Sequence, residues 1–214
     1  MVKIWIGNIT PLLELNKLEV YYNQLPIQRE EKADRQMVPL KKAQSVGAWI
    51  LWNRMKEQYN LTDENVYNLS HSGELVMCVA ATGEDGAMNH RIRLGCDIEK
   101  VREVNEKLPE RFFAPSEIER IKQEPTKERQ REVFFRLWVL KESYMKATRQ
   151  GMGLDMKSFE IRLGDSSAII EQPKEHFGQY HLHEFDWFGG HQEYKMAVCT
   201  TSKKVDKTLH EFEF

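Results

Sequence analysis

Residues 91–100 read RIRLGCDIEK, and every second residue from Ile92 to Ile98 is apolar. Such alternation predicts a strand with one buried face, made of Ile92, Leu94, Cys96 and Ile98. Asp97 and Glu99 then project together from the opposite face. Two neighbouring carboxylates repel each other unless a proton or a cation lies between them, and Mg²⁺ prefers oxygen ligands of this kind. The pair therefore indicates either a magnesium site or a solvated acidic strand edge.

A long helix is predicted further along the chain, from about Gln130 to Thr148, where the glycine turn Gln150–Gly153 follows it. Trp138, Glu142 and Lys146 are four residues apart and therefore share one stripe of this helix. An acid and a base below a tryptophan are unusual on a partly buried face. The alternative is a solvated Glu–Lys pair, which stabilises a helix by roughly 0.2–0.5 kcal/mol.

The rest of the chain mixes strands and helices, and a second half begins near Val104. Strands are predicted at 2–9, 66–69, 75–82, 158–163, 168–171, 180–185 and 194–200, and helices at 12–25 and 41–59. A faint repeat links two of these strands: Glu74-x-x-Met77-x-Val79-x-x-Thr82 matches Glu193-x-x-Met196-x-Val198-x-x-Thr201. The repeat is either a coincidence or the record of a duplicated α+β unit.

The composition is that of an ordinary globular protein with balanced charge. The 214 residues are 41% hydrophobic and 30% charged, and 31 basic against 33 acidic side chains give a net charge of -2. No general attraction to nucleic acid or to an anionic membrane follows from that balance. The first residues, MVKIWIGNI, hold too short an apolar stretch for a secretory signal or a membrane span. Three isolated cysteines lie in apolar runs, so we expect reduced thiols and a cytoplasmic protein.

Two further segments carry groups that could bind a phosphate. Residues 68–73, NLSHSG, are predicted to form a polar loop with hydroxyl, imidazole and backbone N–H donors. This loop could equally be a plain turn, and it holds no carboxylate that would complete a Ser-His hydrolase. The stretch from Gln28 to Lys42 gathers basic residues in an otherwise neutral chain: Arg29, Lys32, Arg35, Lys41 and Lys42.

In this order, the segments resemble motifs of the 4′-phosphopantetheinyl transferases of the surfactin-synthetase-activating type. Asn68–Ser72 resembles the family's (F)NxSHS segment, and Gly95–Glu99 is similar to its G(I/V)D(I/V)E motif. Phe135–Lys146 resembles its (F)xxxWxxKExxxK motif. Phe112–Glu117 resembles an FFxxxE stretch, and Gln150–Leu154 resembles the glycine turn that follows the helix motif. The resemblance covers about residues 20 to 165.

The resemblance implies a fold and a reaction. The fold would be a pseudo-twofold pair of α+β halves, residues 1–103 and 104–214, each a small antiparallel sheet packed with a long helix. The reaction would move the 4′-phosphopantetheine group of coenzyme A to a serine of an acyl or peptidyl carrier protein and release 3′,5′-ADP. Which carrier is the natural partner does not follow from the resemblance.

The resemblance also implies a catalytic group of four residues. Asp97, Glu99 and Glu142 would hold Mg²⁺ on the coenzyme A diphosphate, as such a metal neutralises charge in phosphate transfer. Glu142 would accept the serine proton, directly or through water. Lys146 would contact phosphate or leaving-group oxygens.

A second group, Arg29, Lys32, Ser70 and His71, would bind the 3′-phosphate end of coenzyme A by the same resemblance. The sequence departs from the family here, because Asn60–Val66 stands where the family usually has a Gly-Lys-Pro loop. This departure affects the expected contacts to the adenine and the ribose phosphate of coenzyme A.

The carrier protein is expected to dock on the segment that follows the helix, residues 149–180, with Met152 and Met156 as preferred contacts. The turn at Phe112–Glu117 is the other candidate for docking. Two other functions remain open: a Mg²⁺-dependent enzyme that cleaves diphosphates without a carrier, and a catalytically silent carrier-binding module. A chain that contains both halves favours a monomer.

Overall fold

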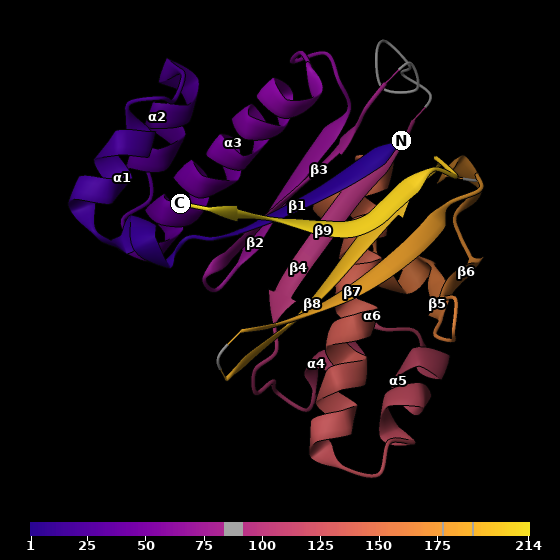
Figure 1. Ribbon diagram of the computed structural model, residues 1–214. Helices are drawn as coiled ribbons and strands as arrows, with labels where there is room; N and C mark the ends of the chain where they lie inside the picture. The colour runs from indigo at the N-terminus through magenta and orange to yellow at the C-terminus, as the bar shows by residue number, and fades with distance from the viewer. Residues whose placement is uncertain (84–91, 177, 190) are drawn as a thin grey trace. The chain divides into compact units, whose positions relative to one another are not determined.

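The computed structural model describes residues 1–83, 92–176, 178–189 and 191–214, with Met152 described by its backbone alone. The chain divides into two compact units, Met1–Ile92 with Lys204–Phe214, and Arg93–Lys203. Each unit combines a small sheet with helices, which confirms the α+β class (Figure 1). Among the described residues, no helix is long and apolar enough to cross a membrane.

The first unit is built on a four-stranded sheet of order β2-β3-β1-β9. Its strands are β1 (Val2–Asn8), β2 (Tyr67–Ser72), β3 (Leu75–Ala81) and β9 (Val205–Glu213). β1 is antiparallel to β3 and parallel to β9, so the first and last strands of the chain lie side by side (Figure 1). The long helix α3 (Pro39–Tyr59) packs on this sheet, and the shorter helices α1 (Leu15–Tyr22) and α2 (Ile27–Asp34) pack on α3.

The second unit has an antiparallel three-stranded sheet of order β4-β8-β7. Its strands are β4 (Leu94–Lys100), β7 (His181–Gly189) and β8 (Gln192–Thr200), and a separate pair joins β5 (Glu160–Arg162) to β6 (Ala168–Glu171). The helix α6 (Lys127–Thr148) packs against β4 and β8. Two short helices, α4 (Leu108–Phe112) and α5 (Pro115–Lys122), precede it.

Four features differ from the sequence expectations. The division near residue 103 lies instead before Arg93, because β4 pairs with β8 and so belongs to the second unit. The C-terminal strand β9 was not predicted, and it returns to the first unit. The helix expected at 12–25 is interrupted, with a 3₁₀ turn at Thr10–Leu13 before α1. The loop expected at 68–73 is a strand as far as Ser72, because its backbone pairs with β3.

The faint repeat falls on similar places in the two units. Its first copy covers β3 and its second covers β8, and each is an inner strand of its sheet. Each also packs against the long helix of its own unit, α3 or α6. An inner strand beside a long helix is buried on the helix side, and this shared environment accounts for the common spacing of apolar residues.

Candidate active site

Gly95 brings the helix α6 directly against the strand β4. A Cβ atom at this position would lie 2.2 Å from the carbonyl oxygen of Ser143 and 2.4 Å from the backbone nitrogen of Ala147. Any side chain would therefore push the two backbones apart. Asp97 and Glu99 follow Gly95 at steps of two, so they point to the same face of β4, toward α6.

Asp97 meets Lys146 of α6 at this contact. The Lys146 Nζ atom donates a hydrogen bond to Asp97 Oδ1 at 2.7 Å. The Asp97 side chain is 6% exposed and that of Lys146 is 26% exposed. Burial disfavours the charge on Lys146, but the Asp97 carboxylate outweighs this effect and raises the pKa of the ammonium. Lys146 is therefore a positive charge held beside the middle of β4.

Glu142 lies one helical turn before Lys146 and is half-buried. Burial raises the pKa of its carboxyl, and the negative charge of Asp97 raises it further, while Lys146 opposes both. This coupling shows that Asp97 and Glu142 belong to one electrostatic group. A carboxylate whose pKa is raised is a better proton acceptor than an ordinary glutamate.

The donor set suits Mg²⁺ in kind. Asp97, Glu99 and Glu142 offer carboxylate oxygens, the ligands that this ion prefers. Within the described parts of the chain, however, no three such side chains stand close enough together to hold a metal ion as they are. Glu99 and Glu142 are half-buried, so their carboxylates are partly open to solvent. The chemistry of the donor set therefore fits the ion.

Ser70 and His71, which were expected to bind phosphate, lie in the first unit on the strand β2. Ser70 pairs with Met77 and is buried, whereas His71 pairs with Val76 and is exposed. Successive strand residues point to opposite faces, which explains the difference. His71 is thus the member of the pair that can reach a ligand in solvent.

The two basic candidates lie on α2 in the same unit. Lys32 is exposed. The Arg29 guanidinium lies over the ring of Trp49, 3.9 Å from its centre, so α2 is anchored to α3 at this point. Stacking uses the face of a guanidinium and leaves its N–H edge for an anion. In contrast, Lys42 is paired with Asp34 at 2.8 Å and is drawn into a structural contact.

Comparison with known proteins places the chain in a family. Residues 93–199 match the family described as "ACPS: 4′-phosphopantetheinyl transferase superfamily". The chain belongs to this superfamily. The match nearly coincides with the second unit, and it includes Asp97, Glu99, Glu142 and Lys146.

Individual relatives carry the same name. The chain is 33% identical over 134 residues to "4′-phosphopantetheinyl transferase Sfp" of Bacillus subtilis strain 168, which covers 62% of this chain and 54% of that protein. It is 36% identical over 122 residues to "4′-phosphopantetheinyl transferase HetI" of a Nostoc species, covering 56% of this chain and 45% of the relative. The chain thus spans about half the length of the curated relatives that it matches. A solved holo-[acyl-carrier-protein] synthase of Thermotoga maritima aligns with 50% of this chain and 62% of its own, at 22% identity and a TM-score of 0.41.

A buried ion pair that the sequence did not predict joins α6 to α5. The Lys141 ammonium lies 2.9 Å from Glu117 and donates to the carbonyl oxygens of Met156 at 2.8 Å and Phe159 at 2.7 Å. Burial lowers the pKa of Lys141, and Glu117 opposes that shift. Lys141 therefore ties α6 to α5 and to the chain after the helix, while its neighbour Glu142 faces the candidate site. In the sequence, the position of Lys141 among the apolar residues of α6 was the only indication that its side chain is buried.

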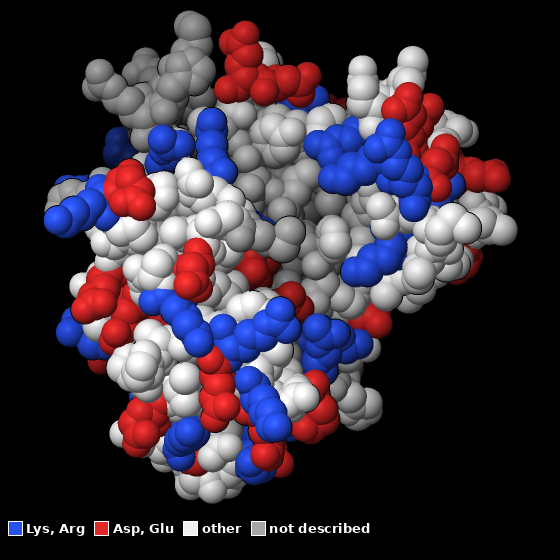
Figure 2. Space-filling model, turned by 180° about the vertical axis from the view of Figure 1, so that it is seen from behind, with Lys and Arg blue, Asp and Glu red and all other residues white. Residues whose placement is uncertain are grey.

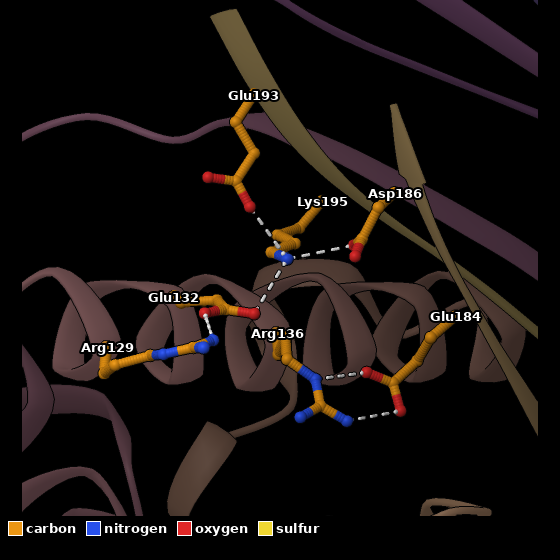
Figure 3. A network of polar contacts seen from close by, with 7 residues as sticks. All are labelled: Arg129, Glu132, Arg136, Glu184, Asp186, Glu193 and Lys195. Atoms are coloured by element: carbon orange, nitrogen blue, oxygen red, sulfur yellow. Dashed lines mark hydrogen bonds and ion pairs between the residues drawn. The ribbon is translucent and has the colours of Figure 1, made fainter. Parts of the chain in front are cut away.

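A second network joins α6 to the hairpin β7–β8 (Figure 3). Lys195 is 2% exposed, and its ammonium contacts Glu193 at 2.9 Å, Asp186 at 3.1 Å and Glu132 at 3.3 Å. Burial lowers the pKa of Lys195, but hydrogen bonds to Glu193 and Asp186 outweigh it and the net direction is upward. Nearby, Arg136 contacts both carboxylate oxygens of Glu184, at 2.8 and 3.3 Å.

The preferred docking contact Met156 was wrong. Its side chain is 5% exposed and belongs to the core of the second unit, together with Leu154 and Phe159. A residue that fills a core cannot meet a partner without unfolding that core. The other preferred residue, Met152, has a side chain outside the described part of the structure.

Proposed function

We propose that this protein transfers the 4′-phosphopantetheine group of coenzyme A to a serine of an acyl or peptidyl carrier protein. The serine oxygen attacks the phosphorus that carries pantetheine, the bond from that phosphorus to the bridging oxygen breaks, and 3′,5′-ADP leaves. The observation that carries the proposal is the contact of β4 with α6, which couples Asp97 to both Glu142 and Lys146. This contact lies within the segment that matches the superfamily.

The proposed roles follow from the chemistry of each side chain. Asp97, Glu99 and Glu142 would hold Mg²⁺, which when bound neutralises charge on the diphosphate. The Lys146 ammonium would donate to oxygens of the departing phosphate, where negative charge develops. Glu142 would accept the serine proton directly or through water, and its raised pKa supports that role.

The 3′-phosphate of coenzyme A is proposed to bind in the first unit. A phosphate dianion needs charge-assisted donors, and Arg29, Lys32 and His71 supply them on α2 and β2. Ser70, which precedes His71, is buried. Its hydroxyl would bind only a group that enters the edge of the sheet. The superfamily match begins after all four residues. Their proposed role therefore rests on the resemblance, and for Lys32 and His71 also on their exposure to solvent.

A groove of the second unit is the better candidate for carrier docking. It has a volume of about 470 Å³ and lies between the chain after β4, α5 and the start of α6. Apolar side chains line it, among them Ile118, Ile121 and Phe134. The charged residues around it are of both signs: Lys107, Lys122, Lys127 and Arg131, with Glu103, Glu106 and Glu110. Lys127 and Arg131 are paired with Glu106 and Glu103. Carrier domains are acidic around the modified serine, so the apolar floor and the exposed ammonium groups of Lys107 and Lys122 would be the parts that meet them.

This docking site predicts a selective effect of rim charge. Changing the exposed Lys107 and Lys122 to Glu should raise KM for an apo carrier severalfold and leave KM for coenzyme A within twofold, because only the carrier meets the rim. Changing Arg149 and Lys157, exposed residues of the segment first considered, gives the matched control. A larger effect in the control pair would return docking to residues 149–180.

The chain is further proposed to act as a monomer in a reducing, cytoplasmic setting. Its three cysteines are all buried free thiols. On the face in Figure 2, Lys and Arg side chains are interspersed with Asp and Glu, in keeping with a net charge of -2.

One experiment separates the transferase from its alternatives. The protein is incubated with coenzyme A, Mg²⁺ and several apo carrier proteins, and the products are weighed by mass spectrometry. A carrier that gains phosphopantetheine together with released 3′,5′-ADP supports the proposal. Cleavage of coenzyme A without a carrier would indicate the diphosphate-cleaving enzyme. Carrier binding with neither product would indicate a silent module.

A further inference from the structure

The sheet face that meets α6 carries its charges in two rows across the strands. One row contains Asp97, Ala197 and Glu184, and the next contains Glu99, Lys195 and Asp186. Opposite residues of antiparallel strands point to the same face, with their Cβ atoms about 4.5–5.5 Å apart. Lys195 is therefore the direct cross-strand neighbour of two carboxylates, Glu99 on β4 and Asp186 on β7.

The two rows are neutralised in different ways. In the first row, α6 supplies a base to each acid: Lys146 to Asp97 and Arg136 to Glu184. In the second row, the base Lys195 belongs to the sheet itself, and α6 supplies the acid Glu132. The cation of the second row thus lies between two strand carboxylates, and its direction decides which of them it neutralises.

The structure shows which way this cation turns. An ammonium has three N–H donors. The Lys195 ammonium is surrounded by three carboxylates, those of Glu132, Asp186 and Glu193 (Figure 3). None of the three comes from β4. Glu132 is held in turn by Arg129 at 2.7 Å, which fixes the far side of the network.

We propose that Glu132, Asp186 and Glu193 retain the Lys195 ammonium and so prevent it from pairing with Glu99. The Lys195 side chain is long enough to reach its cross-strand neighbour, and such a pair would neutralise a carboxylate assigned to Mg²⁺. Lys195 and its three partners are thus positioning residues for the cation site. The inference rests on the proposed function, because it takes Glu99 as a ligand.

The test measures binding of Mn²⁺, used as a probe for Mg²⁺, by the spin-resonance signal of free Mn²⁺ at saturating coenzyme A. Asp186→Asn removes the negative charge of one of the three partners of Lys195, and we expect Mn²⁺ to bind at least threefold more weakly. Glu184→Gln is the matched control. It removes the same charge from the same strand, in the row of Asp97, but leaves the partners of Lys195 intact, so binding should stay within twofold of wild type.

A second pair of variants tests the direction of the effect. Glu193→Gln should act like Asp186→Asn, since it removes another partner of Lys195. Asp186→Asn combined with Lys195→Met should restore Mn²⁺ binding to within twofold of wild type, because the Lys195 ammonium can then no longer pair with Glu99. In the transfer assay, the Mg²⁺ concentration for half-maximal rate should follow the same order.

Three results would overturn the inference: unchanged Mn²⁺ binding in Asp186→Asn, an equal loss in Glu184→Gln, or a folded double variant that stays weak. Thermal unfolding identifies variants that fail to fold. If the double variant does not fold, the comparison of Asp186→Asn with Glu184→Gln still tests the inference. If the wild type neither binds Mn²⁺ nor modifies a carrier, the proposed function fails as well. If the wild type binds Mn²⁺ and modifies a carrier, and Asp186→Asn binds Mn²⁺ as tightly as the wild type, the inference alone fails.

Discussion

Single residues divide the helix α6 into a structural side and a chemical side. Lys141 and Glu142 are neighbours in sequence, yet Lys141 is sealed in the core with Glu117 while Glu142 is half-buried next to Asp97. A turn of about 100° per residue separates them on the helix. Lys141 thus fixes the helix to the core, and Glu142 keeps the partial exposure that its proposed role requires.

Replacement of Asp97 tests the chemical side. Asp97→Asn keeps the shape of the side chain but removes the charge that holds Lys146. We expect transfer to fall by about 100-fold or more, while circular dichroism and thermal unfolding show a folded protein, because Lys146 remains partly exposed to water. The control is Glu128→Gln, an exposed acid in the first turn of α6, which should keep its activity. Full activity of Asp97→Asn would remove Asp97 from the site.

The pKa of Glu142 gives a pH-dependent prediction with a definite sign. Burial and the Asp97 charge raise this pKa, and Lys146 lowers it. The Glu142 carboxyl should therefore ionise at a higher pH than an ordinary glutamate in the metal-free protein. Asp97→Asn should shift that titration to lower pH, and Lys146→Met should shift it to higher pH. Carbon-13 NMR of labelled glutamate carboxyls measures it, with Glu142→Gln to assign the signal; shifts of the opposite sign would refute the coupling.

The elements that build the site were largely predictable, because local patterns define them. The alternation of residues 91–100 predicted β4, and the four-residue spacing of Trp138, Glu142 and Lys146 predicted the half-buried stripe of α6. The partners of these elements were not predictable, since β4 pairs with β8 about one hundred residues later and no local pattern encodes that register. The role of Lys195 depends on that register and was missed for the same reason.

Gly95 is the position at which the packing of two elements decides the geometry of the site. Gly95→Ala places a methyl group against the backbone of α6 at Ser143 and Ala147, and neither backbone can rotate away. We expect a loss of about 1–3 kcal/mol in the free energy of unfolding and a fall in kcat, because the Asp97–Lys146 contact lengthens. Denaturant unfolding and steady-state kinetics measure both. Gly153→Ala, which meets no atom within 4 Å, is the control, and equal effects in both variants would contradict the packing argument.

The whole molecule consists of two units, each with its own hydrophobic core. The first unit is closed by the C-terminal strand, whose irregular spacing of apolar residues does not indicate a strand. Parallel pairing of the first and last strands joins residues about two hundred positions apart, and such a contact leaves no trace in a single sequence. The boundary between the units was therefore misplaced for the same reason that β9 was missed.

The C-terminal aromatic residues should stabilise the first unit alone. Phe212 stacks on Trp5 at 6.4 Å, and Phe214 packs edge-on against Tyr21 at 5.5 Å. Phe214 also lies on Gly7, where a Cβ atom would be 2.6 Å from its ring. Changing both phenylalanines to Ala removes this contact from β1 while the core of the second unit keeps all its members.

Hydrogen exchange then provides the measurement. We expect amide protection to fall in β1 and β3 and to persist in β4 and β8, because stability is distributed over separate cooperative units. Coenzyme A binding should weaken with the first unit, since Arg29, Lys32 and His71 belong to it. Phe188→Ala, at an aromatic that is 68% exposed in the second unit, serves as the control and should change neither. Equal loss of protection in β8 would show that the two units unfold as one, so that the C-terminal strand stabilises the whole chain.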